Sequence, residues 1–189
     1  MINRLLALAV IILMTIPTQV YSKEKSEIIS LYKGSKLIFD DEIGHEEHYY
    51  MTSASSQKVI EGDMRRRFCQ VPKGVSPLEV VKNFEQAIKK KGGSIIHFSK
   101  QANRFTDKKT GERVWFMSKY FANARKQHNH YGYMQLVNYA RHYVVGKVAT
   151  DANDVFISVA ASTIENKTYY TLVTVTIKPM DMNNVTLNI

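Results

Sequence analysis

The chain has 189 residues, of which 44% are apolar, and a formal net charge of +9. This length suits one domain with a substantial core. Because Cys69 is the only cysteine, a disulfide or redox pair within the chain is excluded, and the fold must depend on apolar packing. We expect Cys69 to be buried and unreactive; an exposed Cys69 would instead indicate a disulfide between chains.

The N-terminus has the pattern of a secretory signal peptide. Arg4 precedes an apolar run from Leu5 to Ile16, and the small residue Ser22 ends the segment. As a helix, this run spans about 18 Å, which is too short for a hydrocarbon core of about 30 Å. We predict a signal peptide over residues 1–22 and a single domain over residues 23–189 with no membrane span.

Loss of Arg4 with the signal peptide lowers the formal charge from +9 to +8. Such an excess of positive charge favours anionic neighbours. Because the protein is expected to be exported, envelope polymers and lipid head groups are better candidates than nucleic acid. The expected location is the periplasm, with outer-membrane association or secretion left open.

Short strands are predicted at Lys36–Phe39 and Tyr49–Met51, with a turn at Thr52–Gln57 and a longer strand at Val59–Val71. The longer strand alternates between two faces. One face carries Ile60, Met64 and Phe68, and the other carries Glu61, Asp63, Arg65 and Arg67.

The strongest local pattern predicts a helix over residues 77–91. Ser76 and Glu79 have the spacing of a capping box, and Pro77 occupies the first helical position. Apolar residues recur at helical spacing along one side, and Gly92 supplies the C-terminal stop. A strand at Ser94–Ser99 follows, and we expect it to pair with the strand that precedes the helix.

The remaining pattern predicts a possible second helix, a loop and then strands. Val114, Met117 and Phe121 have helical spacing, whereas residues 127–132 have the composition of a loop. From Leu136 onward the pattern turns toward strands. The β-rich runs are Arg141–Val148, Val155–Ala161 and Tyr169–Ile177, with turns at Asp151–Asp154 and Glu165–Lys167. The prediction is an α+β domain with a mostly antiparallel sheet and a C-terminal β-meander.

Histidines offer two weak metal-site candidates. His45 and His48 are three residues apart in a segment predicted to be a loop, whereas the metalloprotease signature needs histidines four apart on a helix. His128 and His130 alternate, but no third ligand is identifiable. We expect no metal site and no cofactor.

No catalytic motif is present: there is no nucleophile elbow, no glycine-rich phosphate loop and no cysteine with an adjacent histidine. Whether the chain is an enzyme stays open, since catalytic groups are assembled in space. Tyr131, Tyr133, Tyr139 and Tyr143 form a cluster in sequence, which favours core packing over a stacking surface.

Basic residues are the better binding candidates. Arg65 and Arg67 project together from one strand face and, with Lys89 and Lys90, could hold an anionic ligand. The alternative is charge balance against nearby Glu61 and Asp63, and the spacing favours it.

Several segments together resemble an exported family of Gram-negative bacteria whose domain, of unknown function, occurs alone or in front of an OmpA-like peptidoglycan-binding domain. The matching segments are Leu31–Ser35, Glu61-Gly62, Cys69–Pro72, Ser76–Val80, Asn83–Ile88, Gly92-Gly93, Asp154–Val159 and Lys178–Met180. A cysteine pair frequent in the family after the strand that here ends at Ser99 is absent. We expect a stand-alone member, so peptidoglycan anchoring does not follow.

This resemblance implies an envelope-resident domain without a known reaction. Together with the positive charge, it favours a non-enzymatic module that binds an envelope component or an envelope protein. The alternatives are a hydrolase of an envelope polymer with a spatially assembled site and, less favoured, an exported nucleic-acid binder.

Overall fold

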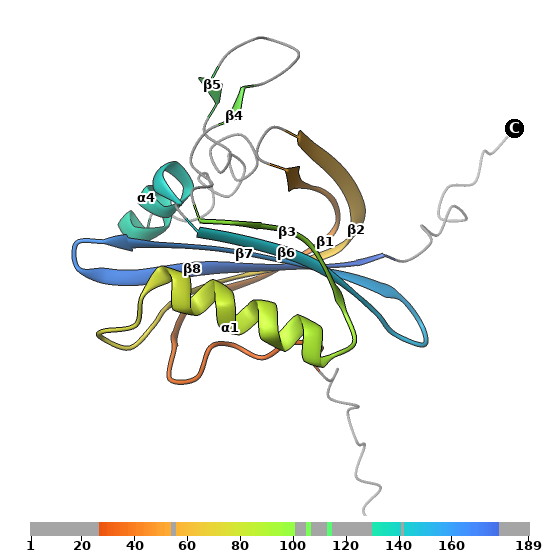
Figure 1. Cartoon of the computed structure of the whole chain (residues 1–189), viewed down its shortest axis with the longest axis horizontal. Helices are drawn as coiled ribbons and strands as arrows, with labels where there is room; N and C mark the ends of the chain where they lie inside the picture. Colours follow the sequence, from red (N-terminus) through yellow and green to blue (C-terminus); the bar gives the residue numbers. More distant parts are fainter. Residues whose placement is uncertain are drawn as a thin grey trace, which may run out of the picture.

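The computed structural model describes residues 27–53, 56–100, 105–106, 113–114, 130–140 and 142–177. Its centre is a six-stranded antiparallel sheet in the order β1-β2-β8-β7-β6-β3, with a helix packed on it (Figure 1). The six strands are β1 (Lys36–Ser53), β2 (Ser56–Gln70), β3 (Ser94–Ser99), β6 (His142–Ala149), β7 (Asp154–Ile164) and β8 (Lys167–Ile177). The other elements are helices α1 (Pro77–Lys90) and α4 (Tyr131–Tyr139) and the two-residue strands β4 (Phe105–Thr106) and β5 (Arg113–Val114).

Helix α1 confirms the predicted helix, although it ends one residue earlier, at Lys90. The Oγ atom of Ser76 accepts a hydrogen bond of 3.1 Å from the backbone N–H of Glu79, and Pro77 occupies the first turn. The helix packs mainly against β6 and β7. It therefore leaves the β1–β2 side of this sheet face open to other parts of the chain.

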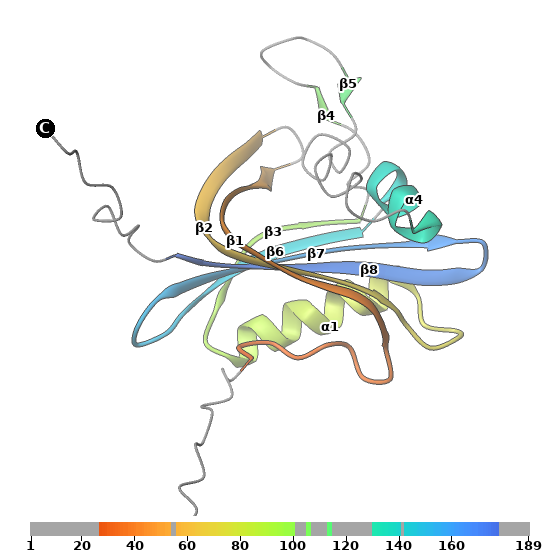
Figure 2. The same cartoon turned by 180° about the vertical axis from the view of Figure 1, so that it is seen from behind.

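Apolar side chains fill both faces of the sheet. On the α1 face, Val81, Phe84 and Ile88 pack with residues of β6, β7 and β8. On the opposite face, Tyr133 and Leu136 of α4 pack against a second cluster (Figures 1 and 2). Two apolar faces explain why β7 is buried along nearly its whole length.

Cys69 lies in the core on the α1 face, free and fully buried, as predicted. Burial raises the pKa of its thiol to about 11. The thiolate is the reactive form of cysteine, so this side chain serves packing.

The sequence prediction of two short strands before residue 52 is wrong, because β1 runs without a break from Lys36 to Ser53. Its polar stretch, including His45–His48, pairs residue by residue with β2 and is therefore not a loop. Gly44 lies at a register shift with φ of 85°, a conformation that glycine adopts easily. The far end of this long hairpin curves toward the α4 side (Figure 2).

Two further predictions are corrected in the second half of the chain. β3 pairs with β6 instead of β2, because β8 occupies the place beside β2. Residues 131–139 form α4, where the sequence predicted a loop and then the start of strands. Of the predicted second helix, Arg113 and Val114 form β5, and the remainder lies outside the described residues.

The predicted C-terminal meander is confirmed by antiparallel pairing of β6 with β7 and of β7 with β8. Glu165 and Asn166 form the turn between β7 and β8 with φ angles of 48° and 61°. Positive φ at both central residues is typical of tight hairpins.

Residues 27–35 precede β1 and lie on the α1 face. Ile29 is buried in the core there, and the Tyr32 backbone N–H donates to the Tyr170 hydroxyl at 3.1 Å. The Tyr32 hydroxyl in turn donates to Glu79 of α1 at 2.6 Å. This segment is thus anchored to both the sheet and the helix.

The predicted signal peptide lies outside the described residues. Within the described ranges, no helix combines the length and the hydropathy needed to cross a membrane.

Candidate functional site

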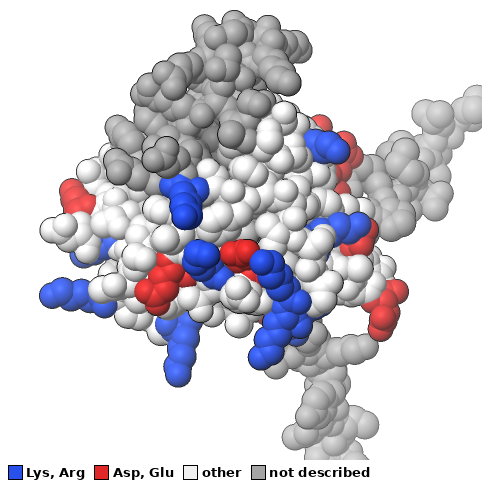
Figure 3. Space-filling view, in the orientation of Figure 1, with Lys and Arg blue, Asp and Glu red and all other residues white. Residues whose placement is uncertain are grey.

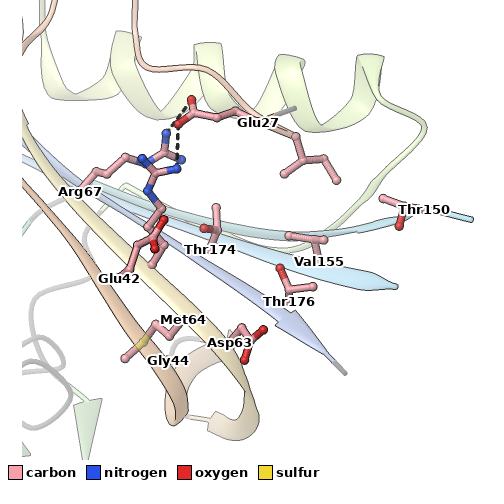
Figure 4. Close-up of a pocket in the computed structure, with 12 residues that line it drawn as sticks. Glu27, Glu42, Gly44, Asp63, Met64, Arg67, Thr150, Val155, Thr174 and Thr176 are labelled. Carbon is pink, nitrogen blue, oxygen red and sulfur yellow. Dashed lines mark ion pairs between the residues drawn. The ribbon is translucent and has the colours of Figure 1, made fainter. Parts of the chain in front are cut away.

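A cavity of about 500 Å³ lies on the α1 face of the sheet, beside the N-terminal segment (Figure 4). We call it the arginine pocket. Its lining residues come from five parts of the chain: Glu27 and Ile28; Glu42 and Gly44 of β1; Asp63, Met64, Arg65 and Arg67 of β2; Thr150 and Val155 near the β6–β7 turn; and Thr174 and Thr176 of β8.

Strand alternation places the two arginines in this pocket. Arg65 and Arg67 are two residues apart in β2 and share a face, as the sequence predicted. Ile60, Met64 and Phe68 pack into the core on the opposite face, which confirms the predicted division.

Both guanidinium groups contact the carboxylate of Glu27. The Nη1 atom of Arg65 lies 3.0 Å from Oε1 of Glu27, and the Nη1 atom of Arg67 lies 2.9 Å from Oε2 (Figure 4). Arg65 also donates two hydrogen bonds to Asp40, from Nε at 2.8 Å and from Nη2 at 2.6 Å. One carboxylate thus bridges the arginine pair, while a second holds Arg65 in the two-bond geometry typical of strong pairs.

Arg67 is the less satisfied of the two arginines. Its side chain is only 3% exposed, yet its Nε atom makes no hydrogen bond in the described part of the chain. Its contact with Glu27 is an ion pair whose alignment falls outside hydrogen-bond geometry. A buried guanidinium group with so few hydrogen bonds lowers the stability of the folded protein, because each buried donor without a partner has lost its hydrogen bonds to water.

The ion pairs shift the ionisation of the residues that make them. The hydrogen bonds from Arg65 hold the pKa of Asp40 below its usual range, and the same bonds raise the pKa of Arg65. The pocket lining itself holds two arginines, Arg65 and Arg67, and three acidic residues, Glu27, Glu42 and Asp63, which gives it a formal charge of −1.

The register of β2 with β8 places threonine hydroxyl groups beside the charged side chains of the pocket. Thr174 pairs with Arg65 across the β2–β8 ladder, and Thr176 pairs with Asp63. Paired residues in an antiparallel ladder share a face, so the pocket floor alternates charged side chains with hydroxyls that can donate or accept.

The other two predicted anion-binding residues do not join this site. Lys89 and Lys90 are exposed at the end of α1, and neither lines the pocket. Lys89 instead forms a 2.6 Å ion pair with Glu85 one turn earlier. On this side of the molecule, basic side chains alternate with acidic ones and do not form one continuous patch (Figure 3).

The spacing of charged residues correctly favoured charge balance for Arg65 and Arg67, but the acidic partners that it indicated are wrong. Arg65 and Arg67 pair with Asp40 and Glu27, not with Glu61 and Asp63 of their own strand. In the β1–β2 ladder Asp40 stands opposite Arg67 and pairs diagonally with Arg65, so pairing the two strands brings this carboxylate close but does not give its partner. Glu27 precedes the first strand, and no local pattern connects it to β2.

The histidines are dispersed. His45 is exposed and pairs across the ladder with Asp63, whereas His48 is buried and pairs with Ile60, so the two rings lie on opposite faces. Burial, followed by the charge of Arg66, lowers the pKa of His48 to about 4.

His130 packs against the rings of Phe68 and Tyr169, and burial lowers its pKa. His128 lies outside the described residues. Within the residues that the structure places, no three histidine, cysteine, aspartate or glutamate side chains come together as a metal-binding group.

The tyrosine cluster divides between core and surface. Tyr133 and Tyr143 are buried, as the core interpretation predicted, whereas Tyr131 is 55% exposed at the start of α4. The side chain of Tyr139 lies outside the described part of the structure.

Comparison of the chain with models of protein families gives no match, and comparison with curated proteins gives none either.

Proposed function

We propose that the chain is a non-enzymatic binding module of the bacterial cell envelope and that the arginine pocket is its binding site. In this proposal the protein is exported to the periplasm by cleavage after Ser22. Its partner is an envelope component or an envelope protein that presents an oxyanion to Arg65 and Arg67. We also place the domain in the α+β class, because α1 is segregated to one face of an antiparallel sheet.

The observation that carries this proposal is the state of Arg67. The Arg67 side chain is 3% exposed, lines a cavity of about 500 Å³ and has one ion-pair partner in the described part of the chain. Its guanidinium group can therefore bind a further oxyanion. The partner it has, Glu27, is 40% exposed and can move into solvent. The resemblance to an exported family and the expected charge of +8 after signal cleavage support an envelope location.

The proposal is tested by retention of the purified exported protein on peptidoglycan sacculi and on vesicles containing anionic lipid, at low salt. Arg67→Met removes the charge but keeps a long apolar side chain. Glu27, which loses its contact with Arg67 in this variant, is 40% exposed and still pairs with Arg65, so its carboxylate is not left buried and unpaired. We expect this variant to lose retention on whichever of the two materials binds the native protein.

The matched control is the double variant Lys89→Ala and Lys90→Ala, which removes two exposed positive charges outside the pocket. It should be retained like the native protein. If neither material retains the native protein, or if the lysine variant loses retention while Arg67→Met does not, the proposal fails.

One observation favours the hydrolase as a second candidate. Glu27, Glu42 and Asp63 bring carboxylates from three separate segments to one pocket, and paired carboxylates can act as general acid and base. Release of soluble fragments from sacculi, abolished by Asp63→Asn or by Glu42→Gln, would support hydrolysis. Intact sacculi after prolonged incubation would exclude this substrate.

A further inference from the structure

We propose that the ligand of the arginine pocket is a short peptide segment with a free carboxylate at one end and a free ammonium group at the other. This inference rests on the proposed function and specifies its ligand. The carboxylate would replace Glu27 on Arg67 and Arg65, and the ammonium group would lie against Asp63.

Glu27 shows which chemical group the arginine pair accepts. Its carboxylate contacts one Nη1 atom of each arginine at 2.9–3.0 Å, as a ligand carboxylate would do. Because the contact with Arg67 is poorly aligned, an incoming carboxylate that is free to orient can form better hydrogen bonds with this guanidinium. Glu27 thus occupies the site as an internal competitor.

The charge of the pocket argues against a ligand that is only anionic. With Glu27 displaced and its charge in solvent, the lining retains Arg65, Arg67, Glu42 and Asp63, and Asp40 remains paired with Arg65. The lining itself is then formally neutral, and with Asp40 included these groups carry a formal charge of −1, against −2 while Glu27 is in place. A ligand with one positive and one negative group matches such a site better than a polyanion does.

Strand geometry sets the length of the ligand. Asp63 and Arg67 are four residues apart on one face of β2, so their Cα atoms are separated by about 13 Å. Asp63 lies at the opposite end of the pocket from Arg67 (Figure 4). An extended chain covers about 3.3–3.6 Å per residue, so three residues cover about 10–11 Å and four cover about 13–14 Å. A peptide of three or four residues therefore matches the separation of the two charged groups.

The floor between these ends suits a peptide backbone. Thr174 and Thr176 line the pocket at the level of Arg65 and Asp63, and their hydroxyls can both donate to carbonyl groups and accept from amide N–H groups. A volume of about 500 Å³ falls within the range of small-ligand sites.

Calorimetry on the purified exported protein with the tripeptide Ala-Ala-Ala tests this inference. The controls are the same peptide with an acetylated N-terminus and with an amidated C-terminus, because each modification removes one charge and leaves the chain length unchanged. We expect the unmodified peptide to bind and each modified peptide to bind at least about tenfold more weakly.

Two charge-neutralising variants locate the ends of the peptide. Glu27→Gln should strengthen binding of Ala-Ala-Ala about two- to fivefold, because it removes the internal competitor. Asp63→Asn should weaken binding of Ala-Ala-Ala while leaving binding of the acetylated peptide unchanged. Glu165→Gln, in the exposed β7–β8 turn, is the matched control and should bind like the native protein.

The outcomes separate this inference from the proposed function. Equal binding of all three peptides, or no binding of any, overturns the inference; the proposed function still stands if retention on envelope material depends on Arg67. If peptide binding follows the predicted pattern, a free peptide is distinguished from a polymer-borne one by whether intact sacculi compete with Ala-Ala-Ala.

Discussion

At the residue scale, His48 is a buried imidazole, 5% exposed, on the α4 side of the sheet. Its pKa in the folded protein is lowered from 6.5 to about 4, first by burial and then by the charge of Arg66. The unfolded chain therefore binds a proton at this residue that the folded chain rejects. The stability it contributes is fully present above pH 6.5 and is lost as the pH falls toward 4.

We predict that the free energy of unfolding decreases by roughly 3 kcal/mol between pH 7 and pH 4 through His48 alone. His48→Leu should flatten this part of the pH profile, measured by urea unfolding. His45→Gln alters an exposed histidine of the same strand and should leave the profile unchanged. An identical pH dependence in native protein and His48→Leu would contradict the prediction.

Cys69 provides a second test at this scale. Since its thiol is fully buried with a pKa of about 11, we expect almost no reaction with a thiol reagent at pH 8 in the folded protein. Addition of denaturant should release one reactive thiol per chain. Rapid labelling of the native protein would show that this part of the core opens readily.

At the element scale, helix α1 begins where local chemistry places it. Ser76→Ala removes the hydrogen bond to the Glu79 amide and should lower the free energy of unfolding by about 1 kcal/mol. Lys90→Ala, an exposed change at the other end of the helix, should have a small effect. Chemical denaturation measures both, and equal stability of the two variants would argue against the cap.

Elements with complete local patterns could be predicted from the sequence, and those fixed by distant contacts could not. The Ser76 cap of α1 and the alternation of β2 depend on neighbouring residues, and both are confirmed. The return bond from the Glu79 side chain to Ser76, which completes a capping box, does not form, because this carboxylate accepts from Tyr32. The continuity of β1 depends on pairing with β2, and the place of β3 depends on β6. In the arginine pocket, the alternation of β2 was enough to predict that Arg65 and Arg67 share a face. The contact of both arginines with Glu27 could not be predicted, because it joins segments far apart in the sequence and no local pattern indicates it.

The packing of β2 against β8 depends on a close approach at Gly62. A Cβ atom added there would lie 2.4 Å from the backbone oxygen of Thr176. Gly62→Ala should therefore destabilise the protein by about 1–3 kcal/mol, because backbone must move to accommodate the methyl group. Glu61→Ala, at the exposed neighbouring position, is the control in thermal unfolding. A tolerated Gly62→Ala would mean that the two strands separate easily.

At the scale of the whole molecule, the sheet has an apolar cluster on each face, and residues 27–35 complete the α1 side. The segment is held by Ile29 in the core and by Tyr32, which bonds both Tyr170 and Glu79. The arginine pocket therefore exists only when this segment is in place. The proposed cleavage after Ser22 would leave this segment, including Glu27, in the mature protein.

We predict that the exported protein begins at Lys23 and retains Glu27. Intact-mass measurement of the exported protein checks this, with residues 23–189 as the expected species. A mature protein that begins after Glu27 would lack the internal carboxylate, and the arginine pair would then be open to ligand from the start.

The most direct test of the account follows Arg67 itself. In protein labelled with ¹⁵N, the Nε–H resonance of Arg67, assigned by its loss in Arg67→Met, is observed while Ala-Ala-Ala is added. We predict a saturable shift of this resonance, absent when the C-terminally amidated peptide is added instead. A resonance that does not move although the protein binds the peptide would place the binding site elsewhere and contradict the assignment of the arginine pocket.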